Sequence, residues 1–162
     1  MMDDDKELAA AIEAIALRAG AAIMEIYGRD FAVETKADQS PVTEADQAAE
    51  VIIVAALREL TPDIPVVAEE EVSAGHQPDV GAGPFWLVDP LDGTREFISR
   101  NGDFTVNIAL IRGGDPVLGT VYVPARAETY TAAGPGQLTR RRRAGAPEAI
   151  SARAPASDGL VA

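Results

Sequence analysis

The sequence contains no cysteine and a single histidine, His76. Disulfide bonds, iron–sulfur clusters, thiolate zinc sites and multi-histidine metal sites are therefore excluded. Basic residues are also in deficit, since 14 Lys and Arg stand against 26 Asp and Glu and the formal net charge is −12. General nucleic-acid binding requires a basic surface that displaces counterions, so nucleic acid is not an expected partner.

Long apolar runs are missing as well. The longest strongly apolar stretch, residues 51–57, is far too short to cross a bilayer, so no stable membrane span is expected. The N-terminus reads MMDDDKE and is acidic where a secretory signal would be basic. We expect a cytoplasmic protein. The arginine run 140–143 would allow peripheral contact with the inner membrane face, but a strand or loop with exposed charges is the simpler interpretation.

Apolar residues are plentiful, at 47% of 162 residues, which suits one domain with a real core or a large part of one. Helical periodicity marks residues 7–27 and 44–60. Alternating or continuous apolar patterns then predict short strands, and a helical turn is expected at residues 94–100. The expected strands are 31–36, 66–68, 85–88, 104–112, 117–123 and 128–132. The chain ends at 159–162 in what reads as another strand. The pattern is α+β: two helices followed by a mainly antiparallel sheet, one face of which lacks a cover.

The densest chemical signal is the string WLVDPLDGT at residues 86–94. Asp89 and Asp92 follow an apolar strand and lie three residues apart, with the Leu91 carbonyl between them. Hard oxygen ligands in a rigid frame suit Mg²⁺. Gly93 and Thr94 would then open a helical turn whose free backbone amides can bind a phosphate. Asp-Pro and Asp-Gly are also ordinary turn formers, but the full string after a buried strand favours a metal and phosphate site.

Two further acidic segments are ambiguous alone. Glu69 and Glu70 end another apolar strand, where adjacent like charges usually mean a solvated surface. If that strand lies parallel to the one bearing Asp89, a third carboxylate reaches the same metal, and two Mg²⁺ ions can be held. Thr43 and Asp46 form a capping box at the start of the second helix. In a sharper interpretation, Asp46 also hydrogen-bonds Thr94, which orients and deprotonates an attacking water.

These strings resemble the lithium-sensitive, Mg²⁺-dependent phosphatases of the inositol monophosphatase superfamily. Residues 86–111 (WLVDPLDGTREFISRNGDFTVNIALI) and 36–46 (KADQSPVTEAD) resemble its 3′(2′),5′-bisphosphate nucleotidase branch in particular. The resemblance runs from about residue 5 to the end of the chain. It implies a layered α/β/α/β/α sugar-phosphatase fold, and a small phosphorylated substrate: adenosine 3′,5′-bisphosphate, hydrolysed to AMP, and its sulfated analogue PAPS. It implies Mg²⁺ as cofactor, two ions or more, with Li⁺ as inhibitor.

The resemblance also implies a role for each site residue. Glu69, Asp89 and the Leu91 carbonyl would bind the first metal, and Asp89 with Asp92 would help to hold the second. The remaining roles are phosphate binding by Gly93 and Thr94, water activation by Thr94 with Asp46, and assistance by Glu70.

Members of this family continue with a second half that carries a Trp-Asp motif, and this chain has only Trp86. Residues 1–162 are accordingly expected to be an N-terminal metal-binding phosphatase domain without the family's C-terminal half. Two alternatives stay open: an inositol or sugar monophosphatase of the same superfamily, and a truncated, non-catalytic fragment that binds Mg²⁺ weakly. His76, in a glycine-flanked loop, is expected to be solvated and not catalytic. The oligomeric state is left open.

Overall fold

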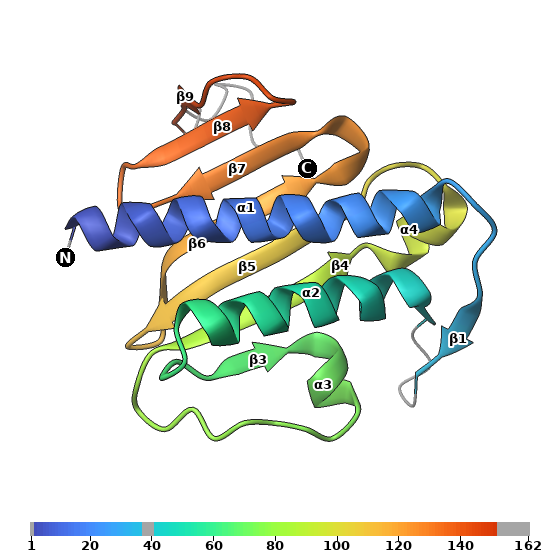
Figure 1. Ribbon diagram of the computed structural model, residues 1–162, viewed down its shortest axis with the longest axis horizontal. Helices are drawn as coiled ribbons and strands as arrows, with labels where there is room; N and C mark the ends of the chain where they lie inside the picture. The colour runs from blue at the N-terminus through green and yellow to red at the C-terminus, as the bar shows by residue number, and fades with distance from the viewer. Residues whose placement is uncertain (1, 37–40, 152–162) are drawn as a thin grey trace, which may run out of the picture.

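Two long helices lie side by side on one face of a seven-stranded sheet in the computed structural model, which describes residues 2–36 and 41–151 (Figure 1). Helix α1 spans Met2–Tyr27 and α2 spans Glu44–Leu60. Each helix buries a stripe of small and branched apolar side chains spaced three or four residues apart, as an amphipathic helix requires. The second helix has the bounds that its periodicity predicts, and the first begins at Met2 rather than at residue 7.

The large sheet runs in the order β3-β4-β5-β6-β7-β8-β9. Strands β3 and β4 are parallel, and every other neighbouring pair is antiparallel, which confirms the predicted mainly antiparallel sheet. The strands are β3 Val66–Ala68, β4 Phe85–Asp92, β5 Thr105–Arg112, β6 Asp115–Val123, β7 Glu128–Ala132, β8 Leu138–Arg142 and β9 Glu148–Ala149.

Smaller elements join these layers. A two-stranded hairpin, β1 Val33–Thr35 with β2 Pro41–Thr43, connects α1 to α2. Two short helices follow the parallel strands, α3 Glu69–Ser73 and α4 Thr94–Ser99, and a 3₁₀ turn η1 spans Pro124–Arg126.

Several sequence predictions for the smaller elements and strand bounds need correction, and one cannot be compared. Residues 31–36 form a strand only over Val33–Thr35, and the acidic run after β3 is helical. Strand β4 does not stop at residue 88: it continues to Asp92 across a register shift. Pairing with β5 resumes at Asp92 after that irregularity. A prediction that follows runs of apolar residues misses this last part of the strand, because it contains two carboxylates. The strand expected at 159–162 lies outside the described residues.

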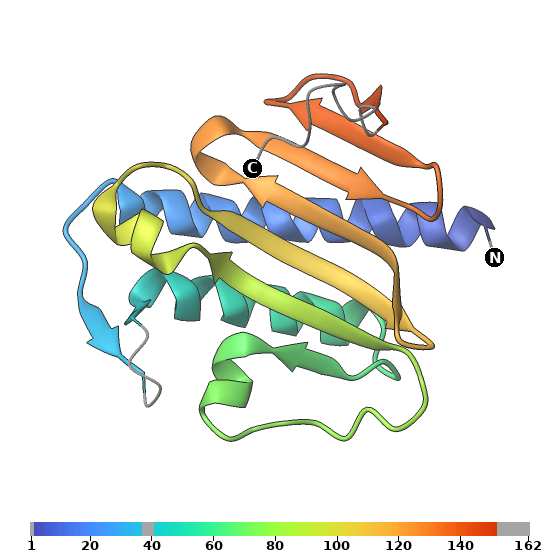
Figure 2. The same ribbon diagram turned by 180° about the vertical axis from the view of Figure 1, so that it is seen from behind.

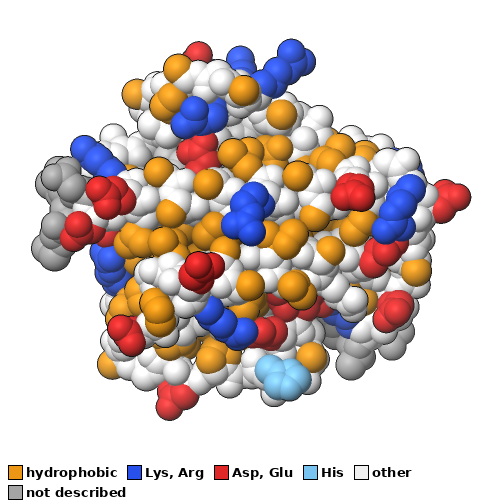
Figure 3. All heavy atoms as spheres, viewed as in Figure 1, with side chains coloured by type: hydrophobic (Ala, Val, Ile, Leu, Met, Phe, Trp, Pro, Cys, Tyr) orange, Lys and Arg blue, Asp and Glu red, His pale blue; other side chains and the backbone are white. Residues whose placement is uncertain are grey.

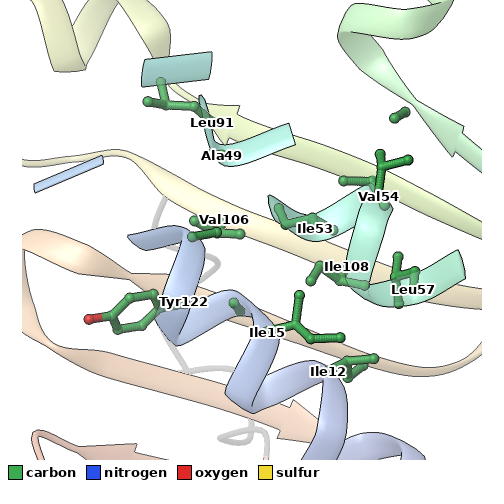
Figure 4. Packing of buried hydrophobic residues seen from close by; sticks show 14 of the residues in the cluster. Ile12, Ile15, Ala49, Ile53, Val54, Leu57, Leu91, Val106, Ile108 and Tyr122 are labelled. Carbon is green, nitrogen blue, oxygen red and sulfur yellow. The ribbon is translucent and has the colours of Figure 1, made fainter. Parts of the chain in front are cut away.

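The core lies between the helices and the sheet. Figure 4 shows side chains of both helices meeting those of β4, β5 and β6. Trp86 is fully buried, and its indole Nε1 donates a hydrogen bond to Thr61 Oγ1 at 2.8 Å, so its polar atom is satisfied. Burial of the motif strand therefore fixes where the residues after Trp86 emerge.

The opposite face of the sheet has neither long helix over it, since both lie behind the sheet in Figure 2. A hollow of about 890 Å³ opens there among largely apolar side chains of β3 to β8, with Leu87 47% exposed. Glu69, Asp89 and Asn107 also line it. Glu69 and Asp89 thus face the open side of the sheet.

Charged side chains of both signs are dispersed over the helix-covered face (Figure 3). The arginines of β8 are paired: Arg140 with Glu148, Arg142 with Glu128, and Arg141 with the buried Glu13 at 2.6 Å. Residues 140–142 of the arginine run therefore lie on a strand, whereas Arg143 follows it in a turn. The three strand arginines pair with carboxylates of the protein itself, so peripheral membrane binding gains no support. In the part of the chain that the structure describes, no helix combines the length and apolar character needed to cross a membrane.

Candidate functional site

The parallel pairing of β3 with β4 brings Glu69 and Asp89 together. Ala68, the last residue of β3, lies opposite Val88, so the residues that follow them, Glu69 and Asp89, lie next to each other at the end of β3. Asp89 Oδ1 is buried and has no hydrogen-bond partner. Burial, the neighbouring Glu69 and the charge of Asp92 together raise the pKa of Asp89 from 3.8 to about 7. An acid in this state either keeps a proton or needs a cation.

Asp92 lies beyond the register shift, on the exposed side of the same cluster. Asn107 of β5 donates from Nδ2 to Asp92 Oδ2 at 3.3 Å, while Asn107 Oδ1 is buried without a partner. The Leu91 carbonyl between the two aspartates accepts from Thr94 Oγ1 at 3.3 Å. Two buried oxygen atoms on neighbouring strands thus lack donors at this point of the sheet.

Lys36 reaches into the acidic cluster from the end of β1. Its Nζ lies 2.7 Å from Glu69 Oε1 and 2.7 Å from Glu70 Oε1, and its side chain is only 9% exposed. Partial burial lowers the pKa of Lys36, but the hydrogen bonds to Glu69 and Glu70 outweigh this and leave the pKa raised. Burial likewise raises the pKa of Glu70, against the opposing effect of Lys36.

The carboxylates do not yet form a complete metal-binding group. Within residues 2–36 and 41–151, no three histidine, cysteine or carboxylate side chains are arranged so that they can share a metal ion. Glu69 turns to Lys36 Nζ, while Asp89 Oδ1 stays without a partner. The residues are neighbours, but an ammonium group holds one of them.

Asp46 and Thr94 meet, as the sharper interpretation of the sequence predicts. Thr94 Oγ1 donates to Asp46 Oδ1 at 3.1 Å, although 48 residues separate the two. The capping box is present too: Asp46 Oδ2 accepts from the Thr43 backbone amide at 2.8 Å and from Thr43 Oγ1 at 2.7 Å. One carboxylate oxygen is thus fixed by the cap, which leaves the other for Thr94. Burial raises the pKa of Asp46 despite these hydrogen bonds.

Glu50 is a residue that the sequence interpretation missed. Its carboxylate accepts from the backbone amides of Glu70 at 2.7 Å and Glu71 at 2.8 Å, so it satisfies the start of α3. Burial raises its pKa, against those two hydrogen bonds. The available signal was its place on the buried stripe of α2, four residues after Asp46.

Gly93 makes the turn from β4 into α4. Its φ is +91°, and a Cβ there would lie 2.9 Å from the Asp103 carbonyl oxygen. Both the backbone conformation and the close approach require glycine. Thr94 consequently begins the helix directly beside the aspartate cluster.

The model of the inositol monophosphatase family matches residues 3–158. The chain belongs to the inositol monophosphatase family. Its α+β architecture agrees with that of solved family members. An extragenic suppressor protein suhB from Bartonella henselae superimposes with a TM-score of 0.73 at 29% identity, covering 85% of this chain and 53% of the other.

Relatives with the name CysQ are more similar in sequence. The 3′(2′),5′-bisphosphate nucleotidase CysQ of Escherichia coli (strain K12) is 53% identical over 121 residues, which is 74% of this chain and 49% of the relative. The crystal structure of CysQ from Bacteroides thetaiotaomicron is 40% identical with a TM-score of 0.68, and covers 84% of this chain and 49% of that one. This family member thus spans about half the length of the curated relatives it matches.

Proposed function

We propose that this chain carries the metal-binding and water-activating half of a Mg²⁺-dependent phosphatase. Its substrate would be adenosine 3′,5′-bisphosphate, cleaved to AMP and phosphate, and Li⁺ would inhibit it. The observation that carries the proposal is the hydrogen bond between Thr94 and Asp46, because it joins two motifs distant in sequence beside an acidic strand end.

The donor types at the strand ends fit magnesium. Asp89 Oδ1 is a buried, unpartnered carboxylate oxygen, and hard oxygen atoms are the ligands that Mg²⁺ prefers. Glu69, Asp89, Asp92 and the Leu91 carbonyl would hold the metal, with Glu70 beside them. When bound, Mg²⁺ would supply positive charge that attracts the phosphate, lowers the pKa of water and stabilises the leaving oxygen.

The protein's own contribution is proton transfer at Thr94. Because the Thr94 hydroxyl donates to Asp46 Oδ1, its oxygen lone pairs are available to accept a proton from water. As the water proton passes to Thr94 Oγ1, the Thr94 proton passes to Asp46. The raised pKa of Asp46 favours that acceptance. The water oxygen attacks phosphorus as the bond to the 3′-oxygen breaks, the leaving 3′-oxygen takes up a proton from solvent to become the hydroxyl of AMP, and Asp46 returns its proton to solvent.

The phosphate would sit at the start of α4. The first amides of a helix have no intrahelical acceptor, and those of Gly93 and Thr94 would donate to the phosphate oxygens. The absence of a side chain at Gly93 leaves its backbone accessible, and its close packing on Asp103 sets the position of that backbone.

Sequence identity favours the nucleotide over inositol phosphates. Relatives named bisphosphate nucleotidase reach 54% identity over 121 residues, whereas the inositol monophosphatase from Anabaena is 28% identical over 85% of this chain. An inositol or sugar phosphatase remains the competing proposal, and a non-catalytic magnesium-binding fragment is the third.

The deciding experiment measures phosphate release from adenosine 3′,5′-bisphosphate and from inositol 1-phosphate, with Mg²⁺, with Li⁺ added, and with chelator. We expect release from the nucleotide that requires Mg²⁺ and falls with Li⁺. Thr94→Ala should reduce the rate by about 10²-fold or more, as expected for lost general-base catalysis. Ser99→Ala is the matched control, because Ser99 lies at the other end of α4 and its hydroxyl donates only to Glu96 O at 3.2 Å.

Three outcomes separate the proposals. Preferential release from inositol 1-phosphate would support the competing phosphatase. Calorimetric binding of Mg²⁺ without turnover of either substrate would support the non-catalytic fragment. Equal rates for Thr94→Ala and Ser99→Ala would show that the Thr94 hydroxyl takes no part in the reaction.

A further inference from the structure

Arg100 lies where helix α4 ends, and its backbone conformation there is unusual. Its φ is +59°, in the left-handed region that residues other than glycine seldom adopt. Glycine is the common residue at such a helix end, because it adopts this conformation without strain. The presence of arginine therefore directs attention to what its side chain contacts.

The Arg100 guanidinium joins the end of α4 to the end of α1. Its Nη1 donates to the carbonyl of Tyr27, the last residue of α1, and its Nη2 donates to the Arg29 carbonyl at 2.7 Å. The guanidinium carbon also lies 5.4 Å from the centre of the Tyr27 ring and 5.1 Å from that of Phe31. The last carbonyls of a helix have no intrahelical donor, and a cation beside them is favoured. One side chain thus binds both the end of α1 and the segment that follows it.

The middle of α4 is held by an aromatic cluster. Phe97 is fully buried, and its ring centre lies 4.8–5.2 Å from those of three other aromatic residues, Tyr27, Phe31 and Phe104. Apolar packing holds the helix against the protein, but it has little directional preference. The orientation of α4 therefore depends on the hydrogen bonds made at its two ends.

The short length of α4 couples its two ends. Phe97 lies midway between Thr94 and Arg100, three residues from each. At about 1.5 Å per residue, each end is about 4.5 Å from this buried point. A pivot about Phe97 that moves the Arg100 end by about 1 Å therefore moves Thr94 by about 1 Å in the opposite direction. The hydrogen bond from Thr94 Oγ1 to Asp46 Oδ1 is already 3.1 Å long, so a shift of this size would break it.

We propose that Arg100 is a positioning residue for proton transfer at Thr94. The inference rests on the proposed function, in which the Thr94 hydroxyl accepts the proton of the attacking water. By tying the end of α4 to the end of α1, Arg100 keeps that hydroxyl within hydrogen-bond distance of Asp46. It acts through α4, since its guanidinium donates to the carbonyls of Tyr27 and Arg29.

The first test compares Arg100→Gly with Arg112→Gly. Glycine removes the Arg100 side chain and is compatible with φ +59°. Arg112 is the matched control, because its guanidinium also holds α1, but through Asp5 at 3.0 Å near the other end of that helix. We expect Arg100→Gly to lower kcat for adenosine 3′,5′-bisphosphate about tenfold, since a misplacement of about 1 Å can cost up to about 10²-fold. Arg112→Gly should keep the wild-type kcat even where its melting temperature falls.

A second test asks whether Arg100 acts through Thr94. Arg100→Gly should have little effect on kcat once Thr94→Ala has removed the hydroxyl, whereas a loss of folded protein would lower kcat by the same factor in both backgrounds. Guanidinium chloride, far below denaturing concentration, should restore kcat in Arg100→Gly, because the lost side chain is exposed and its place is open to solvent. It should restore neither Arg112→Gly nor the double variant.

Arg100→Lys decides the matter if Arg100→Gly does not fold. Lysine keeps the charge, but a single ammonium does not reproduce the two-pronged contact with the carbonyls of Tyr27 and Arg29, so kcat should fall by an intermediate factor. Wild-type kcat in a folded Arg100→Gly or Arg100→Lys overturns the inference and leaves the proposed phosphatase standing. Equal losses with and without the Thr94 hydroxyl overturn it as well. If the wild-type protein releases no phosphate from either substrate, the proposed function fails and this inference fails with it.

Discussion

Replacing Asp89 with asparagine should make the metal-free protein more stable. The pKa of Asp89 is raised to about 7, chiefly by burial and then by Glu69, so its ionised form is disfavoured in the fold. Asparagine has nearly the same shape and resembles the protonated acid. At pH 8, Asp89→Asn therefore removes an unfavourable charge without opening a cavity.

The magnitude follows from the difference between the two pKa values. A rise from 3.8 to about 7 corresponds to about 4 kcal/mol at about 1.4 kcal/mol per unit. Because the side chain is partly accessible to water, solvent screening reduces this to about 2 kcal/mol. For a chain of this size, that is an increase in melting temperature of about 4–8 °C.

The pH dependence has a definite sign. A raised folded pKa means that the folded protein binds the proton more tightly than the unfolded chain. The associated stability is complete below the unfolded pKa and is lost as the pH rises from about 4 to about 7. The gain from Asp89→Asn should therefore be largest above pH 7 and vanish near pH 4.

The assay is thermal unfolding in chelator between pH 4 and pH 8, repeated with Mg²⁺. Asp63→Asn serves as control, because Asp63 is exposed. In Mg²⁺ the order should reverse, since wild type gains stability from the ion and Asp89→Asn has lost a ligand. An Asp89→Asn protein that melts at or below the wild-type temperature in chelator at pH 8, or that keeps the full Mg²⁺ response, would refute the reasoning.

Two other predictions concern the scaffold of the site. Gly93→Ala should cost about 2 kcal/mol or more of folding stability, because alanine at φ +91° is strained and its Cβ also meets the Asp103 carbonyl oxygen at 2.9 Å. Gly113→Ala is the control, since Gly113 has φ +62° with nothing within 4 Å and so shows the cost of the backbone conformation alone. Equal losses of melting temperature in the two variants would show that the contact with Asp103 contributes nothing. Glu50→Ala should cost about 1–3 kcal/mol of folding stability, because it leaves the backbone amides of Glu70 and Glu71 without their acceptor. Glu50→Gln retains an acceptor and should lose less in the same thermal unfolding measurements. An unchanged melting temperature for Glu50→Ala would show that water replaces the carboxylate.

Local patterns predicted what depends on local physics. The bounds of α2 follow from its apolar periodicity and from Thr43, whose capping box with Asp46 uses only neighbouring residues. The exposure of His76 likewise follows from its polar, glycine-flanked surroundings. The contact of Asp46 with Thr94 could be predicted for a different reason, because both residues belong to segments whose resemblance to a known family implies that they pair.

Contacts between distant segments with no such string were missed. Arg141 pairs with the buried Glu13 over 128 residues, and nothing in an arginine run indicates which member faces the core. Lys36 belongs to a quoted motif, yet its ammonium could not be assigned to Glu69 before the hairpin was placed. Side-chain periodicity gives the face of an element but not the partner across it.

The parallel pairing of β3 with β4 is the part of the topology on which the site depends. Val67 lies opposite Leu87, so Glu69 and Asp89 lie at equal distances beyond that pair. If β3 ran antiparallel about the same central pair, Glu69 would lie opposite Phe85, four residues from Asp89. At about 3.3 Å per residue the separation along the sheet would be about 13 Å, too far for one metal ion to bridge. The crossover through α3 and the loop 74–84 returns the chain to the start of β4 and so makes the parallel pairing possible. The antiparallel strands β5 to β9 supply core and sheet surface, but they could not by themselves bring these two carboxylates to one edge.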